Sequence, residues 1–166
     1  MTPEQYKKYL HFKETFLDRA PTKDMVRKNY KGKKYIPVSI SRPAFAKLFP
    51  MHKTETTYTE VYNSTKSGKM FIFAKVRITA HLYIDDEFIC EIIHEAFGSA
   101  EEGNKDETHI ASVAEGYATR KAIAKFGKFF GMYFEADDAI STNVTEVQST
   151  ISEGVNKKIA GLPRDI

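Results

Sequence analysis

The apolar positions near the start of the chain follow helical periodicity. Thr2 can act as an N-cap, Pro3 stands at the first helical position and Glu4 lies in the first turn, and each of these favours a helix that begins there. One apolar stripe then runs along the predicted helix; it consists of Tyr6, Leu10, Phe12, Phe16 and Leu17. We expect the helix to end at about Arg19, because the residue before Pro21 is disfavoured in a helical conformation.

Two shorter elements are predicted between this helix and Pro50. Residues 35–40, Tyr-Ile-Pro-Val-Ser-Ile, are typical of a short strand. Pro37 places that strand at a sheet edge or a bulge, because proline cannot donate a ladder hydrogen bond. Residues 41–49 are expected to form a short helix with Ser41 as its N-cap.

A block of alternating residues follows and predicts an antiparallel meander. Strands are expected at 54–63, 70–84 and 87–97, where Val, Ile, Thr, Tyr and Phe are frequent. Residues 64–69 form the first hairpin loop, and Asp85-Asp86 forms a tight turn. Residues 98–107 are expected to be an acidic loop that contains glycine.

A long second helix is predicted from Thr108 to Phe134. On a helical wheel at about 100° per residue, its second half has one basic arc and one apolar, largely aromatic arc. The basic arc consists of Arg120, Lys121, Lys125 and Lys128, and no acid lies between Gly116 and Phe134. An amphipathic helix with a solvated lysine face is the simpler alternative. Gly127 and Gly131 indicate close approach of another backbone or a bend, since glycine in a helix costs about 1 kcal/mol.

The predicted fold class is α+β. The N-terminal helix is followed by an antiparallel meander of three to four strands, which packs on one long C-terminal helix. Residues 1–135 are expected to form a single domain and residues 136–166 a partly ordered C-terminal tail, where periodicity is weak.

The single cysteine and the lack of long apolar segments indicate in which compartment the protein is found. Cys90 is the one cysteine, which rules out an internal disulfide or an all-cysteine metal site. No apolar run approaches the roughly 20 residues that a membrane-spanning helix needs, and the first residues have no apolar signal region. We therefore expect a cytoplasmic protein with no membrane association.

Charge is sorted along the chain. The net charge of +3 is the sum of +9 in residues 1–53, −6 in residues 54–107, +3 in residues 108–134 and −3 in residues 135–166. Six of the basic residues lie between positions 23 and 34, with Asp24 as the only acid. This sorting favours a basic surface for a polyanion, although an ordinary solvated surface is the alternative.

Residues that could carry catalysis do not form a known motif. The five histidines are scattered, and His94-Glu95 lacks the second histidine of a zinc-protease helix. Cross-strand pairing of His81 with His94 is a less favoured alternative to ordinary sheet histidines. Paired acids occur at 85–86 and 137–138, so a small metal-dependent nuclease stays open. We expect a protein that is not an enzyme and that binds no cofactor or metal.

Residues 118–131, ATRKAIAKFGKFFG, resemble a motif of the Rad-fifty-two family of single-strand annealing proteins. That motif has a basic pair, an apolar step, Phe-Gly and a second glycine four residues later. Arg120 and Lys121 match the pair, and Phe126, Gly127 and Gly131 match the end. Further matches follow in the same order along the chain: Arg27, Tyr35-Ile36, Ala46 to Phe49, Gly68 to Phe71, Val76 to Ile78 and Leu162 to Arg164. The family's last motif arginine falls at Ala124 here, with Lys125 beside it.

The resemblance implies a short phage or bacterial member that anneals single strands of DNA in recombination and repair. It implies a homo-oligomeric ring with a basic groove for single-stranded DNA, whose floor is the sheet and the long helix. Arg27, Tyr35, Arg120 and Lys121 would line it, and Lys69 would belong to a second DNA site. To these we add Lys28 and Lys33 from the basic run, and Lys125 and Lys128 from the basic arc. A phage exonuclease or single-strand-binding protein is a further candidate partner. A DNA-binding protein without annealing activity is the alternative.

Overall fold

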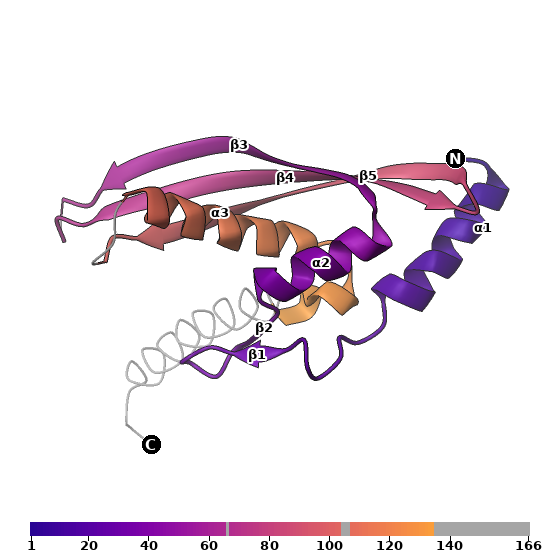
Figure 1. Cartoon of the computed structure of the whole chain (residues 1–166), viewed down its shortest axis with the longest axis horizontal. Helices are drawn as coiled ribbons and strands as arrows, with labels where there is room; N and C mark the ends of the chain where they lie inside the picture. Colours follow the sequence, from indigo (N-terminus) through magenta and orange to yellow (C-terminus); the bar gives the residue numbers. More distant parts are fainter. Residues whose placement is uncertain (66, 104–106, 135–166) are drawn as a thin grey trace, which may run out of the picture. The chain divides into compact units, whose positions relative to one another are not determined.

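A three-stranded antiparallel sheet with one helix packed on it forms the centre of the fold (Figure 1). The computed structural model describes residues 1–65, 67–103 and 107–134. The sheet has the order β3-β4-β5, with β3 at Met51–Asn63, β4 at Met70–Ile84 and β5 at Glu87–Glu101. Helix α3, Glu107–Ala124, follows the sheet. The predicted α+β fold with an N-terminal helix and a meander packed on a C-terminal helix is thereby confirmed, with three strands in the meander.

Alternation in β4 separates the two faces of the sheet. Every second side chain from Ile72 to Leu82 is buried, because α3 covers that face. The turn to β5 consists of Asp85 and Asp86, which both have positive φ, at 52° and 63°. Positive φ at both central residues is the requirement of the tightest hairpin turns, so the predicted turn is confirmed.

Helix α3 lies unusually close to β5. A Cβ atom at Gly98 would stand 2.2 Å from the Ala114 carbonyl oxygen and 2.4 Å from the Ala118 amide nitrogen. Gly98 therefore belongs to the strand that the helix crosses, and β5 continues to Glu101. The prediction that an acidic loop begins at residue 98 is wrong, since this glycine lies within the strand, where the α3 backbone leaves no room for a Cβ atom.

The second helix is shorter than predicted. It ends at Ala124, and after a turn the chain forms a single 3-10 turn, η2, at Lys128–Phe130. Gly127 is extended, with φ at 162°, and a Cβ atom there would lie 2.6 Å from the Leu17 carbonyl oxygen. The predicted continuous helix over 108–134 is thus wrong, whereas the close approach of another backbone, one of the two alternatives inferred from the glycines, is confirmed at Gly127.

The N-terminal helix forms as predicted. α1, Pro3–Phe12, continues into a π-helical turn, η1, at Lys13–Leu17. Thr2 Oγ1 accepts a hydrogen bond from the Gln5 amide at 3.2 Å, and Gln5 Oε1 accepts one from the Thr2 amide at 2.8 Å. This reciprocal pair satisfies backbone donors that the first helical turn leaves open.

The predicted strand at residues 35–40 is wrong beyond Tyr35. Helix α2 spans Val38–Leu48 and has Pro37 at its N-cap position. Ser41 is consequently a buried helix residue and not the cap. Packing of aromatic rings favours the helix. The centre of the Phe45 ring lies 4.7 Å from that of Phe126 and 4.9 Å from that of Phe49, and these rings form an aromatic core. A helix can direct both phenylalanines into this core.

The basic run before α2 forms a small hairpin, which is a sheet of its own. β1 is Arg27–Lys28 and β2 is Lys34–Tyr35.

Contacts divide the chain into residues 1–132 and 133–166; the predicted C-terminal tail lies outside the described residues. Within the described part of the chain, no helix is long and apolar enough to cross a membrane.

Candidate nucleic-acid interface

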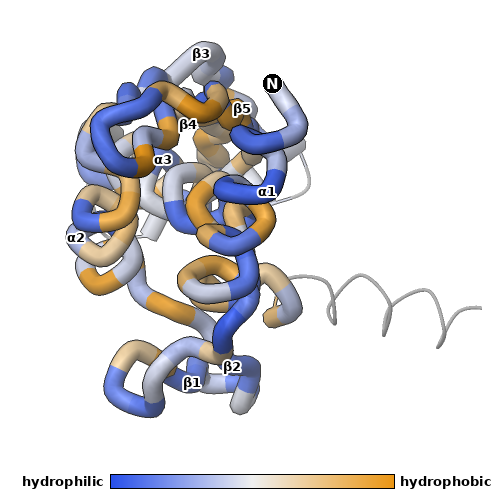
Figure 2. The backbone as a smooth tube through the Cα atoms, turned by 90° about the vertical axis from the view of Figure 1, so that its right-hand side faces the viewer, coloured by the Kyte–Doolittle hydropathy of each residue, from blue (hydrophilic) through white to orange (hydrophobic). Residues whose placement is uncertain are grey.

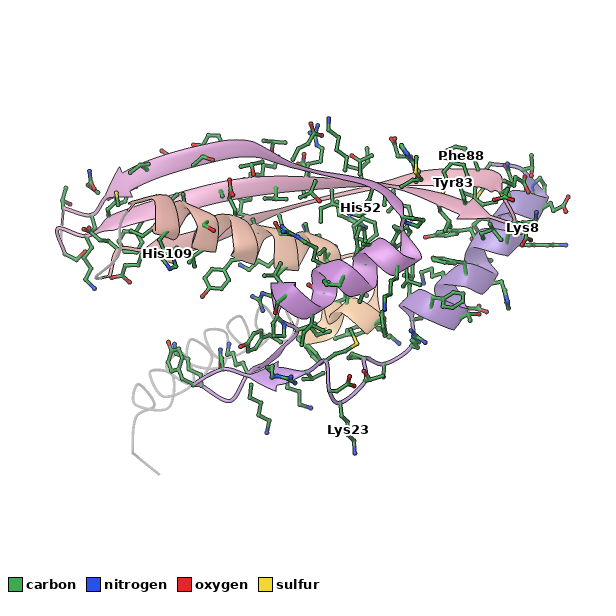
Figure 3. All side chains as sticks on the ribbon, in the orientation of Figure 1. Lys8, Lys23, His52, Tyr83, Phe88 and His109 are labelled. Carbon is green, nitrogen blue, oxygen red and sulfur yellow. The ribbon has the colours of Figure 1, made fainter. Side chains whose placement is uncertain are left out.

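The β1–β2 hairpin concentrates positive charge without any acid. Residues 27–35 read RKNYKGKKY and contain five Lys or Arg side chains. Lys28 and Lys33 are exposed, as expected for phosphate-binding residues. The hairpin lies on the helix-covered side of the sheet and is largely hydrophilic (Figure 2). Figure 3 shows Lys23, just before the hairpin, pointing away from the rest of the chain.

Strand pairing brings Arg27 to Tyr35. The two residues are direct partners in the antiparallel register, and partners of this kind have their side chains on the same face. The Arg27 guanidinium donates to the Asp24 carbonyl oxygen at 2.6 Å and to the Val26 carbonyl oxygen at 3.1 Å. These hydrogen bonds hold the guanidinium near its own backbone while the side chain stays exposed.

Arg120 joins this pair from α3. Its guanidinium carbon lies 5.4 Å from the centre of the Tyr35 ring and 5.9 Å from that of the Tyr117 ring. Both distances are within the range of cation–π attraction. Arg27, Tyr35 and Arg120 thus come together although nearly a hundred residues separate the hairpin from the helix. Lys121, the next residue on α3, is half-buried.

Lys125 and Lys128 do not share a helical arc with Arg120 and Lys121. Both are exposed, but they lie beyond the end of α3, so the predicted basic arc is wrong in its second half. The Lys125 ammonium donates to the Glu95 carbonyl oxygen at 2.5 Å. Lys128 is the first residue of η2. Because the helix ends early, Lys125 lies in the turn that follows it, and Lys128 lies in η2.

Lys69 lies on the hairpin loop between β3 and β4, at the end of the sheet opposite α1 (Figure 1). Its ammonium forms an ion pair with Glu101 at 2.6 Å, and this hydrogen bond raises the pKa of Lys69. A DNA site at Lys69 would therefore be separate from the hairpin and would compete with Glu101.

The histidines do not converge on a reaction centre. The register places His81 opposite Glu91 and His94 opposite Ile78, so His81 and His94 are not cross-strand partners. His94 is packed edge-on against Phe126, with 4.6 Å between ring centres. Burial, and secondarily the Lys125 charge, holds the pKa of His94 below its ordinary value. Among residues 1–65, 67–103 and 107–134, no three His, Cys, Asp or Glu side chains cluster as a metal site would require; Asp137 and Asp138 lie outside these ranges.

The sheet face away from α3 carries a set of exposed aromatic side chains that the sequence reasoning did not single out. We call this set the aromatic face; it consists of Tyr58, Tyr62, Phe73 and Phe97. The Lys75 ammonium lies 5.7 Å from the centre of the Phe97 ring. Strand alternation alone would have placed these residues on one face once the register of the meander was known.

Charged residues continue this face along the sheet. Glu95 pairs with Lys75 at 2.5 Å and with Arg77 at 2.6 Å, and these two cations lower its pKa. At the other end, Tyr83 and Phe88 pack with 5.5 Å between ring centres, and Lys8 of α1 lies nearby (Figure 3). Lys75 and Arg77 of this face are therefore matched by an acid on the neighbouring strand.

No protein-family model and no curated protein matches the chain.

Proposed function

We propose that this chain is a single-strand DNA annealing protein that acts in homologous recombination and repair, in the cytoplasm of a bacterial or phage-infected cell. One observation carries the proposal: Arg27, Tyr35 and Arg120 meet at one place. These three residues belong to the positions that the Rad-fifty-two resemblance assigns to DNA binding. A resemblance by chance gives no reason for distant matches to converge in space.

The residue types at this place suit the gripping of a backbone. Arginine and lysine bind phosphates without reading bases, and residues 27–35 contain five of them and no acid. A strand held by its phosphates leaves its bases available to a complement. Annealing then requires a display surface and no catalytic group. Lys28, Lys33 and Lys121 would extend the contact, and Lys125, Lys128 and Lys69 would be reached only by a longer strand.

A closed homo-oligomer is part of the proposal. Adjacent copies would form a continuous basic groove, and each would present the same hairpin to one long strand. An exonuclease that produces single strands, or a single-strand-binding protein, is the class of partner that would supply the substrate. No metal or cofactor takes part in this mechanism.

The decisive experiment mixes two complementary labelled strands with and without the protein. We expect faster pairing with the protein. We also expect the binding constant for a single strand to fall with salt: for each phosphate contact, its logarithm should decrease by about 0.7 per tenfold increase in salt concentration. Binding without faster pairing would indicate a DNA-binding protein of another kind. Cleavage of either strand in the presence of Mg²⁺ would indicate a nuclease.

A further inference from the structure

Tyr30 at the tip of the β1–β2 hairpin buries almost none of its ring. It is 92% exposed, the largest value among the large apolar and aromatic side chains of the described residues. A single exposed aromatic residue is ordinary on a protein surface. Two features distinguish Tyr30: its loop is held by hydrogen bonds of its own, and it lies in a stretch of five Lys or Arg residues without an acid.

The loop backbone is held by Asn29. The Asn29 side-chain oxygen accepts hydrogen bonds from the amides of Lys31 at 2.9 Å and Lys33 at 3.0 Å. The Asn29 carbonyl accepts from the Gly32 amide at 2.9 Å. Gly32 has a φ of 76°, the left-handed conformation that ends common three-residue hairpin loops. The hairpin therefore presents Tyr30 from a loop in which the amides of the three following residues already have hydrogen-bond partners.

The ring has a cation beside it and belongs to a basic stretch of the chain. The Lys31 ammonium lies 5.5 Å from its centre, and residues 27–35 contain no acid. Single-strand-binding surfaces combine phosphate-attracting charge with aromatic rings on which bases stack. The hairpin supplies both features on one short element, because its strands carry the charge and its tip carries the ring.

We propose that Tyr30 stacks on a nucleobase of the bound single strand, and this proposal rests on the proposed DNA-binding function. Tyr35 is half-buried and lies beside Arg120, whereas the Tyr30 ring is 92% exposed and has the Lys31 ammonium beside it. The two tyrosines then have different tasks: Tyr35 positions the arginine, and Tyr30 holds one base while its neighbours stay available for pairing.

Stacking and phosphate binding respond differently to salt. Stacking releases no counterions, so Tyr30→Ala should weaken binding of an oligothymidine by roughly 5- to 100-fold at every salt concentration and leave the salt slope unchanged. Lys31→Ala should reduce that slope. Tyr30→Phe keeps the ring and should bind as the unaltered protein does. An oligonucleotide of abasic sites has the phosphates without the bases, so Tyr30→Ala should not change its affinity.

A spectroscopic test uses the absence of tryptophan from the chain. Tyr30→Trp places a single tryptophan at the tip, and Tyr83→Trp, near the remote end of β4, is the matched control. We expect oligothymidine to quench the fluorescence of the first variant only, and the abasic strand to quench neither. Wild-type affinity of Tyr30→Ala for oligothymidine, or equal quenching by both strands, would overturn the stacking role while annealing persists. Loss of all DNA binding by the unaltered protein would instead overturn the proposed function together with this inference.

Discussion

Arg27 and Arg120 both meet Tyr35, one through strand pairing and the other through its ring. If both hold one DNA strand, Arg27→Ala and Arg120→Ala should each weaken single-strand binding, by on the order of 1–3 kcal/mol for a charged hydrogen bond. The double variant should lose less than the sum, because the two side chains serve the same strand. Fluorescence anisotropy of a labelled oligonucleotide measures all three affinities.

Lys31→Ala is the matched control for this pair. Lys31 lies on the same hairpin but away from Tyr35, so its loss should cost less than the loss of Arg27. Far-ultraviolet circular dichroism establishes that each variant is folded. An Arg27→Ala protein that binds no worse than Lys31→Ala would remove Arg27 from the site and leave the hairpin as a source of general attraction only.

His94 makes stability depend on pH. Burial against Phe126 holds its pKa below the ordinary value of 6.5, so the unfolded chain binds a proton more readily than the folded one. The stabilisation is complete above pH 6.5 and is lost as the pH falls from there toward the folded-state pKa. Urea titrations at pH 7.5, 6.5 and 5.5 should give a decreasing free energy of unfolding, and His94→Gln should flatten this dependence. The same slope in both proteins would assign it to other groups. Glu95 would not be one of them, because its lowered pKa affects stability only below pH 4.5.

At the level of elements, local alternation predicted the strands well. Met70 to Ile84 and the Asp85-Asp86 turn are found as predicted, because every second residue of β4 had to be apolar once α3 covered one face. The predicted end of β5 failed at Gly98. Glycine commonly marks a loop, and only the approach of α3, a tertiary contact, gives it a place inside a strand.

Helix boundaries were less predictable because distant contacts set them. Apolar spacing correctly predicted that Phe126, Phe129 and Phe130 are buried, yet a turn buries them and not a helix. Gly127 meets the Leu17 backbone, a contact across the chain that no local pattern contains. For the same reason the sequence predicted a basic run but not its hairpin, and it predicted Arg120 but not the neighbouring Tyr117.

Gly98 offers a direct test of how α3 seats on the sheet. A methyl group there would meet backbone atoms of Ala114 and Ala118 at 2.2 and 2.4 Å, so Gly98→Ala must shift the helix. We expect it to lower the free energy of unfolding by at least about 1–3 kcal/mol, as overpacking does. Gly116→Ala is the control, since a Cβ atom on that α3 residue meets nothing within 4 Å and alanine favours a helix by about 1 kcal/mol. Urea unfolding gives the free energy of unfolding of both variants. If Gly98→Ala is as stable as Gly116→Ala, α3 can shift on the sheet without cost.

At the scale of the whole molecule, the described residues include exposed apolar side chains on two different surfaces. One lies on α1, where Tyr6 and Leu10 are exposed and no residue of the helix is buried. We call these two residues the α1 stripe; Tyr6 is 53% exposed. The other is the aromatic face, where Phe97 is 56% exposed. Such surfaces mark sites of association. When two different surfaces of one chain bind each other, the contact is head-to-tail, and it generates a ring if the rotation closes.

This arrangement predicts how disrupted variants behave in mixtures. Unaltered protein should form a closed oligomer, and Tyr6→Glu and Phe97→Glu should each be monomeric in sedimentation velocity at micromolar concentration, because each lacks one of the two surfaces. Tyr6→Glu retains its aromatic face and Phe97→Glu retains its α1 stripe, so an equimolar mixture can form one intact contact per pair and no second one. We therefore expect the mixture to sediment as a dimer and to go no further. If the contact instead joined identical surfaces, one variant alone would remain associated and mixing would add nothing. An unaltered protein that sediments as a monomer with and without DNA would contradict the ring itself.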